Sequence, residues 1–221
     1  MSELSNVLKH CDTRLRSRIS TFGSERYANA IALWAKPVGP LPRAVIHCCT
    51  PEDVQLAIHA ARNSGLSLSV RGGGHDWAGR ALCDGIVIDL QEMRRVDLSA
   101  DHATALISGG ARAMDVLAVT DPVGVVAVAG SAGCIGMAGL TLGGGYGALI
   151  GRFGLAADNL LAAEIVLADG RVVTADSNNE SELLWSLRGG GGNLASLHQC
   201  KSACMVWAAS ARVCLPFRFR R

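Results

Sequence analysis

The stretch SVRGGGHDWAG, residues Ser69–Gly79, places three consecutive glycines between an arginine and a histidine. It continues the alternating run Leu66–Val70, which predicts a β-strand ending at this point. Glycines permit positive φ angles and let backbone N–H groups approach an anion without a Cβ atom in the way. The stretch therefore predicts a loop that can hold a diphosphate, with charge from Arg71 and a nucleophilic nitrogen from His75. A tight turn with a surface histidine is the alternative.

The residues before this loop predict a β-α-β unit. Ala44–Cys49 has the composition of a short strand, and Thr50 followed by Pro51 is the start signal of a helix that should end at Gly65. Ligands of open α/β sheets bind beyond the carboxyl ends of strands, which is where the glycine loop lies. Further elements give an α+β fold, with strands at Gly85–Leu90, Thr104–Ser108, Val125–Val128, Leu161–Leu167 and Arg171–Ala175, and helices at Ala111–Val119 and Ser181–Leu187. Trp185 is expected to pack in the core.

Composition indicates a globular chain whose partner is a small molecule. Its 221 residues are 49% hydrophobic, and a formal net charge of +2 argues against nucleic acid or an anionic membrane as partners. The eight cysteines include the adjacent Cys48 and Cys49, and residues 1–20 lack an apolar signal core. We therefore expect a reducing, cytoplasmic setting rather than a disulfide framework. Neither the cysteines nor the histidines have metal-ligand spacing, so no metal site is expected.

A second glycine-rich stretch, Pro122–Gly151, contains no charged residue. It is long enough to cross a bilayer, but its ten glycines disfavour a spanning helix, so we expect a buried ligand loop and no membrane contact. The run Gly143–Ala148 has the spacing of a dinucleotide fingerprint. That interpretation is rejected, because Gly151 and Gly154 interrupt the helix that such a fingerprint must open. Two glycine loops can instead hold one elongated ligand.

Six motifs follow one another along the chain in an order typical of one flavoprotein superfamily. They are R-G-G-G-H at residues 71–75, then GIVIDL, AGLTLGGGYG, RFGLAADNLL, VLADGRVVT and LLWSLRGGGGN. Together they resemble the FAD-binding domain of the vanillyl-alcohol oxidase / p-cresol methylhydroxylase (PCMH) superfamily, on the branch with berberine-bridge-like and hydroxynicotine oxidases. The resemblance covers residues 27–193 and implies an α+β PCMH-type domain of two subdomains. Residues 1–26 are expected to form a helical lead-in.

The resemblance implies FAD as the cofactor, with its diphosphate wrapped by the first glycine loop. His75 stands where relatives bond the flavin 8α-methyl carbon, a bond that makes the flavin a stronger oxidant. A second bond from a cysteine is not expected, because Ala132 occupies that position and Cys134 is more simply a small buried residue. The cofactor-binding residues expected in this way are Arg71, Gly72, Gly73, Gly74, His75, Ser131, Gly136, Gly139, Leu142, Gly143, Gly144, Asn159 and Val172.

The final segment, residues 194–221, departs from the family pattern. It contains five basic residues, no acidic ones and three cysteines, whereas the relatives continue into a β-rich substrate domain. We expect an aberrant basic tail that lies outside the fold and arises from a change of reading frame; a genuine basic tail for a partner or a membrane is the alternative. The chain is thus expected to be truncated, with the substrate domain missing or supplied in trans, and no catalytic residue is assigned.

Two functions remain open on this basis. The first is an FAD-dependent oxidase that oxidises a small organic substrate by hydride transfer to covalently bound FAD, with reoxidation by O₂. The second is a flavin-binding module without turnover of its own. Production of H₂O₂ separates the two.

Overall fold

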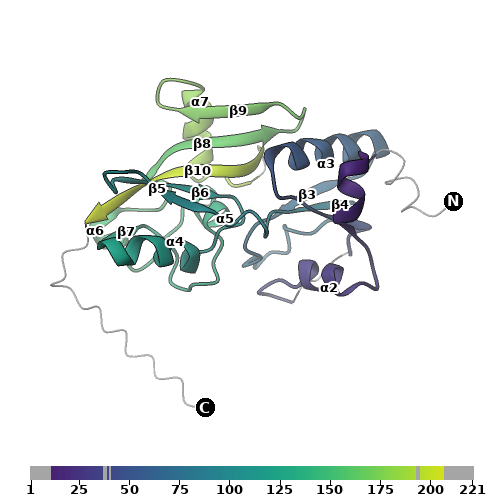
Figure 1. Ribbon diagram of the computed structural model, residues 1–221, viewed down its shortest axis with the longest axis horizontal. Helices are drawn as coiled ribbons and strands as arrows, with labels where there is room; N and C mark the ends of the chain where they lie inside the picture. The colour runs from purple at the N-terminus through teal and green to yellow at the C-terminus, as the bar shows by residue number, and fades with distance from the viewer. Residues whose placement is uncertain (1–10, 37–38, 40, 193–194, 207–221) are drawn as a thin grey trace, which may run out of the picture.

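The computed structural model describes residues 11–36, 39, 41–192 and 195–206, which form two β-sheets and the helices that cover them (Figure 1). The elements in chain order are η1 (Thr13–Arg18), β1 (Ile19–Ser20), α2 (Glu25–Ile31), β2 (Ala44–His47), α3 (Pro51–Ser64), β3 (Leu68–Arg71), β4 (Ile86–Asp89), β5 (Val96–Leu98), β6 (Thr104–Ser108), α4 (Ala113–Thr120), η2 (Asp121–Val123), β7 (Val125–Ala127), α5 (Met137–Leu142), α6 (Ile150–Phe153), β8 (Leu160–Leu167), β9 (Val172–Asp176), α7 (Ser181–Leu187) and β10 (Ala195–Val206). The smaller sheet has the strand order β1-β2-β4-β3. The larger has the order β5-β6-β10-β8-β9, with β7 also paired to β10.

The predicted β-α-β unit is confirmed as β2, α3 and β3. The Thr50 hydroxyl accepts the backbone N–H of Asp53, and the Asp53 carboxylate accepts the N–H of Thr50, which together form a capping box at the start of α3. The helix ends at Gly65, whose φ of 64° favours glycine. Local sequence signals therefore fix both ends of this helix.

Three parallel strands of the smaller sheet end at one edge. β4 lies between β2 and β3, and the register pairs Asp89 with His47 on one side and with Arg71 on the other. Arg71 is the last residue before the glycine loop, so the sheet fixes where that loop begins. β1 extends the same sheet beyond β2, in an antiparallel pairing. The expected boundary at residue 27 is therefore wrong, because Ile19–Ser20 already belongs to the sheet.

The larger sheet packs against α4, α5 and α7. Side chains such as Ile107 and Ile165 are buried between the sheet and these helices. On α7, Leu184 and Leu187 share the buried face, whereas Trp185 is 73% exposed. The expectation that Trp185 packs in the core is wrong, because a neighbour one residue along a helix is rotated by about 100° from the buried position.

The expectation that residues 194–221 lie outside the fold is wrong for the part that the structure describes. Ala195–Val206 forms β10, which pairs antiparallel with β6 on one side and with β8 on the other. The side chains buried at alternate positions of this strand are Ser196, His198, Cys200 and Ser202. Burial thus has the period of a strand, but most of the buried residues are polar, so hydrophobic periodicity does not show it. Residues 207–221 lie outside the described residues.

The charge-free stretch Pro122–Gly151 forms η2 in part, β7, α5 and the loops between them. None of the helices within the described ranges has both the length and the apolar character needed to cross a membrane. The stretch instead pairs β7 with the central strand β10 and packs α5 against the larger sheet.

Candidate functional site

The two glycine loops meet in the structure, backbone against backbone. A Cβ atom added at Gly73 would lie 2.5 Å from both the Cα and the N of Gly136. A Cβ at Gly136 would in turn lie 2.5 Å from the N of Gly73, and one at Gly72 would lie 3.1 Å from the carbonyl oxygen of Gly109. No side chain fits at Gly73 or Gly136 without movement of the chain. The prediction that both loops contribute to one site therefore agrees with their contact, which only glycine permits.

A buried guanidinium lies beneath the first glycine loop. Arg71 is 3% exposed; its Nη1 lies 3.2 Å from Oδ1 of Asp89, and its Nη2 donates to the carbonyl oxygen of Ala32 at 3.1 Å. Burial lowers the pKa of Arg71, and the adjacent Asp89 carboxylate opposes that shift. A Cβ atom at Gly74, whose φ is 74°, would lie 2.8 Å from Nη2. Charge-assisted hydrogen bonds from Arg71 to the bound group stay a prediction, and the structure places its Nη atoms against Asp89 and Ala32 under the loop.

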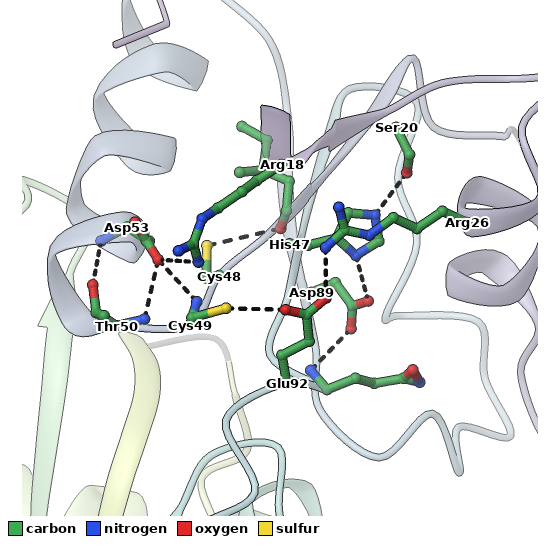
Figure 2. Close-up of polar contacts among 12 residues, drawn as sticks. Arg18, Ser20, Arg26, His47, Cys48, Cys49, Thr50, Asp53, Asp89 and Glu92 are labelled. Carbon is green, nitrogen blue, oxygen red and sulfur yellow. Dashed lines mark hydrogen bonds and ion pairs between the residues drawn. The ribbon is translucent and has the colours of Figure 1, made fainter. Parts of the chain in front are cut away.

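A chain of buried polar contacts continues from Asp89 to the first strand (Figure 2). Oδ2 of Asp89 lies 3.1 Å from Nδ1 of His47, and Nε2 of His47 lies 2.7 Å from the Ser20 hydroxyl. The order of serine, histidine and carboxylate is that of a hydrolytic triad. Ser20 is only 6% exposed, however, and the carboxylate is shared with Arg71. This serine–histidine–aspartate relay therefore supports the glycine loop rather than meeting a substrate.

Two adjacent cysteines lie beside the relay. The Cys49 thiol donates to Oε2 of Glu92 at 3.0 Å, and Oε1 of Glu92 accepts Nη2 of Arg26 at 2.5 Å (Figure 2). Burial, the hydrogen bond to Glu92 and its charge raise the pKa of the Cys49 thiol, and burial raises that of Cys48. Both thiols therefore stay protonated near neutral pH and are poor nucleophiles. All seven cysteines in the described ranges are free thiols.

His75 follows the first glycine loop and lies against two tryptophans. The indole of Trp34 stacks on its imidazole with ring centroids 4.5 Å apart and an interplanar angle of 18°. Trp77 meets the same ring by an edge, at 6.0 Å and 61°. The backbone N–H of Trp34 also donates to the carbonyl oxygen of Gly74 at 2.9 Å. Among the described residues, none forms a hydrogen bond or ion pair with the His75 ring.

Four more of the predicted cofactor contacts lie at the surface of the second glycine region. They are Ser131, Gly139, Gly143 and Gly144, of which the first three are exposed and the last is partly exposed. A Cβ atom at Gly139 or Gly144 would meet nothing within 4 Å. Gly144 has a φ of 95°, which favours glycine there for conformational rather than steric reasons. These positions are therefore open to solvent on the side away from the core.

The last three predicted contacts have different surroundings. Leu142 is 5% exposed and packs in the core, while its carbonyl oxygen accepts the N–H of Gly191 at 2.8 Å. Asn159 donates its side-chain amide to the carbonyl oxygens of Phe153 and Leu155, at 2.9 and 2.8 Å. Val172 begins the edge strand β9 and is 42% exposed. The amide of Asn159 thus holds its own loop, and the structure does not bring Val172 into contact with either glycine loop.

Two parts of this site, Trp34 and the serine–histidine–aspartate relay, were not predicted from the sequence. Asp89 ends the apolar strand motif GIVIDL, and a carboxylate at a buried strand end is a signal that could have marked it. Nothing local marks Ser20 or His47, since their contacts depend on strand pairing. No local sequence signal marks Trp34 either, because its partner His75 comes from a distant segment.

Comparisons with known proteins show what the chain resembles as a whole. A family model described as an FAD binding domain matches residues 42–176. The FAD-linked oxidoreductase hasG of Aspergillus fumigatus is 36% identical over 181 residues, which cover 79% of this chain and 38% of that protein. The chain thus spans about two fifths of the length of this curated relative.

Two solved structures of oxidases also match this chain, again over less than half of their own length. The crystal structure of 6-hydroxy-D-nicotine oxidase from Arthrobacter nicotinovorans matches with a TM-score of 0.82 and 31% identity, over 85% of this chain and 42% of that one. Glucooligosaccharide oxidase from Acremonium strictum matches with a TM-score of 0.83 and 27% identity, over 93% of this chain and 43% of that one. The predicted α+β fold of two subdomains is confirmed by these matches.

Proposed function

The chain belongs to the PCMH-type FAD-binding family of FAD-linked oxidoreductases, and from this premise we propose that it holds FAD over the joined glycine loops and bonds it to His75. The observation that carries the proposal is the backbone contact between Gly73 and Gly136. It brings the two glycine loops together into one cradle, in which Gly139 and Gly144 leave the backbone open to a bound diphosphate. When bound, FAD supplies a two-electron acceptor for a hydride from the substrate.

The residues present fit such a cofactor. Glycine at positions 73 and 136 lets the two loop backbones touch, whereas the Cβ directions at Gly139 and Gly144 meet nothing within 4 Å and leave room for another group beside the backbone. Beneath them, the Arg71 guanidinium forms a buried ion pair with Asp89, and its buried Nε has no hydrogen-bond partner among the described residues. This N–H is a donor under the loop that the protein groups described leave unused. Gly72 and Gly74 complete the loop.

His75 is suited to form a covalent bond because none of the described residues forms a hydrogen bond or ion pair with its ring nitrogens. We propose that one imidazole nitrogen supplies the electron pair of a new N–C bond to the flavin 8α carbon. In forming this bond the imidazole of His75 would give up its N–H proton in exchange for one hydrogen of the 8α carbon. FAD would supply the acceptor for the two electrons and two protons released, and O₂ would then take them up as H₂O₂. The glucooligosaccharide oxidase matched above has an 8α-N1-histidyl FAD, and this supports the proposal.

For the whole protein we propose oxidation of a small organic substrate, with O₂ as the final electron acceptor. Support comes from two structural relatives that are oxidases by name. We propose that a further domain, within a longer chain or in trans, supplies the residues that bind the substrate. The site residues described above are assigned only to binding and attachment of FAD. A flavin-binding module without turnover is the competing function.

The test is whether flavin stays with the polypeptide after acid precipitation. We expect the wild-type precipitate to remain yellow and the His75→Ala precipitate to be colourless. His59→Ala, at an exposed histidine on α3, is the matched control and should stay yellow. If the wild-type chain releases all of its flavin on denaturation, the covalent bond is refuted, while FAD binding before denaturation is judged separately by flavin fluorescence.

A second assay separates the two functions. The flavin-loaded chain is mixed with a panel of alcohols, sugars and amines, and H₂O₂ is measured at steady state. Turnover with any of them supports an oxidase. A loaded chain that forms no H₂O₂ beyond the amount released during flavin attachment supports the binding module.

A further inference from the structure

We propose that Trp34 is a positioning residue for His75, holding the imidazole in the orientation from which it bonds the flavin. This inference rests on the proposed function, since it concerns the same covalent bond. It is carried by the stacking of the two rings, with centroids 4.5 Å apart and an interplanar angle of 18°. The two residues come from segments far apart in the chain, so the contact is a product of the fold.

The backbone at Trp34 and two residues before it is hydrogen-bonded to Gly74 and Arg71. The Ala32 carbonyl oxygen accepts Nη2 of Arg71 at 3.1 Å, and the Trp34 N–H donates to the Gly74 carbonyl oxygen at 2.9 Å. Residues 32–34 therefore follow the loop as a strap, defined here by these two hydrogen bonds. Arg71 is itself fixed by Asp89. The indole is thus placed against His75 by the fold, although Trp34 is 58% exposed.

Stacking orients an imidazole without using its nitrogens. The lone pair of the unprotonated nitrogen lies in the plane of the ring, whereas the stacked indole contacts the face of the ring. A hydrogen bond would orient the ring as well, but it would occupy the electron pair that forms the N–C bond. Among the described residues His75 has aromatic partners, Trp34 and Trp77, and no hydrogen-bond partner. The arrangement therefore restricts ring rotation and leaves the nucleophilic nitrogen free.

The size of the effect follows from the strength of an aromatic pair. Such pairs contribute beyond their buried area by an amount equivalent to roughly a 2- to 12-fold change in population. If the stacked orientation is the reactive one, loss of the indole should slow covalent attachment by about that factor. Non-covalent binding of FAD should change less, because Trp34 touches His75 and the outer side of the loop.

The experiment follows covalent attachment after FAD is added to the flavin-free full chain. Aliquots are precipitated with acid over time, and the flavin in the pellet is measured at several FAD concentrations. The rate at saturating FAD reports positioning, whereas the FAD concentration for half-maximal rate reports binding. We expect Trp34→Leu to lower the saturating rate about 2- to 12-fold and Trp34→Phe, which keeps a stacking ring, to restore most of it. Trp185→Leu is the matched control, since this exposed tryptophan lies on α7, and should react as wild type.

A second readout needs no flavin. In NMR spectra of the flavin-free chain, the ring protons of His75 should be shifted upfield by the stacked indole, and Trp34→Leu should remove that shift. Circular dichroism checks that each variant is folded.

The inference is overturned if Trp34→Leu attaches flavin at the wild-type saturating rate, if Trp34→Phe is as slow as Trp34→Leu, or if the His75 resonances do not move. A wild-type chain that never retains flavin would instead refute the proposed covalent function, and this inference with it. The two failures are therefore distinguishable.

Discussion

Gly136→Ala is the sharpest test of the contact between the two glycine loops. Gly136 has φ −71° and ψ 129°, which alanine adopts without strain, so any penalty comes from the added methyl group. That group would lie 2.5 Å from the N of Gly73, about 1 Å short of the roughly 3.5 Å at which such atoms pack. Forcing a loop to move by this amount costs about 1–3 kcal/mol, partly offset by about 0.4–1 kcal/mol from the stiffer unfolded chain. We expect a net loss of about 1–2 kcal/mol.

Urea unfolding followed by circular dichroism measures this loss, and flavin fluorescence measures binding of FAD. A shift of about 1 Å in the cradle should weaken hydrogen bonds to a diphosphate and lower FAD affinity roughly 10-fold or more. Gly151→Ala is the control: nothing lies within 4 Å of its Cβ position in α6, so it should be neutral or stabilising. Adding Gly73→Ala to Gly136→Ala should cost less than the sum, because both methyl groups open the same contact. A fully stable Gly136→Ala chain with wild-type FAD affinity would refute the proposal that the contact between the two glycine loops forms the FAD site.

Three further changes test other parts of the site. Asp89→Asn leaves the buried Arg71 guanidinium without its carboxylate, and urea titration should show a loss of about 3–5 kcal/mol; a loss under about 1 kcal/mol would contradict the support of the loop by this pair. Burial alone would raise the pKa of Asp115, but hydrogen bonds from Arg94 and a backbone N–H hold this pKa below its usual range. The ionised carboxylate therefore stabilises the folded state above the ordinary carboxyl pKa, and this stabilisation disappears as pH falls through the lowered pKa of the folded state. Asp115→Asn should therefore be about 1 kcal/mol less stable than wild type at neutral pH and no less stable at roughly pH 2, whereas a gap that persists in acid would argue against this. Cys134→Ser should keep the flavin attachment and absorption spectrum of the wild type, and a flavin-bearing peptide containing Cys134 would overturn that expectation.

Elements were predictable where their own residues carry the signal. The cap at Thr50 and the stop at Gly65 mark α3 without any tertiary information. β10 was missed because its buried face includes Ser196, His198 and Ser202, whose polar side chains hide the alternation. Its strand form comes instead from backbone pairing with β6 and β8, which no local pattern encodes. Local chemistry thus predicts elements that bury apolar side chains and misses those that tertiary pairing creates.

The residues of the site also divide into those with a local sequence signal and those whose contacts depend on the fold. The glycines at 72–74 have a local reason for their identity, so a diphosphate loop could be proposed from them directly. The burial of Arg71 could not be predicted in this way, because it depends on Asp89 and on the Ala32 carbonyl, both distant in sequence. Trp34 and His47 gain their roles only when strands and loops assemble. Residue type gave the chemistry of the loop, and the fold determined which side chains face it.

The position of β10 also has a consequence for synthesis of the protein. On the ribosome, β5–β6 and β8–β9 can form hairpins early, but β10, the strand that belongs between them, emerges after both hairpins. Until Val206 leaves the exit tunnel, the inner edges of β6 and β8 stay unpaired, and such edges can pair with other nascent chains. Closure of the sheet then requires contacts between residues as distant as Ser108 and Gln199, which slows folding. Yield of folded protein should therefore depend on translation speed and on chaperones that shield open strand edges.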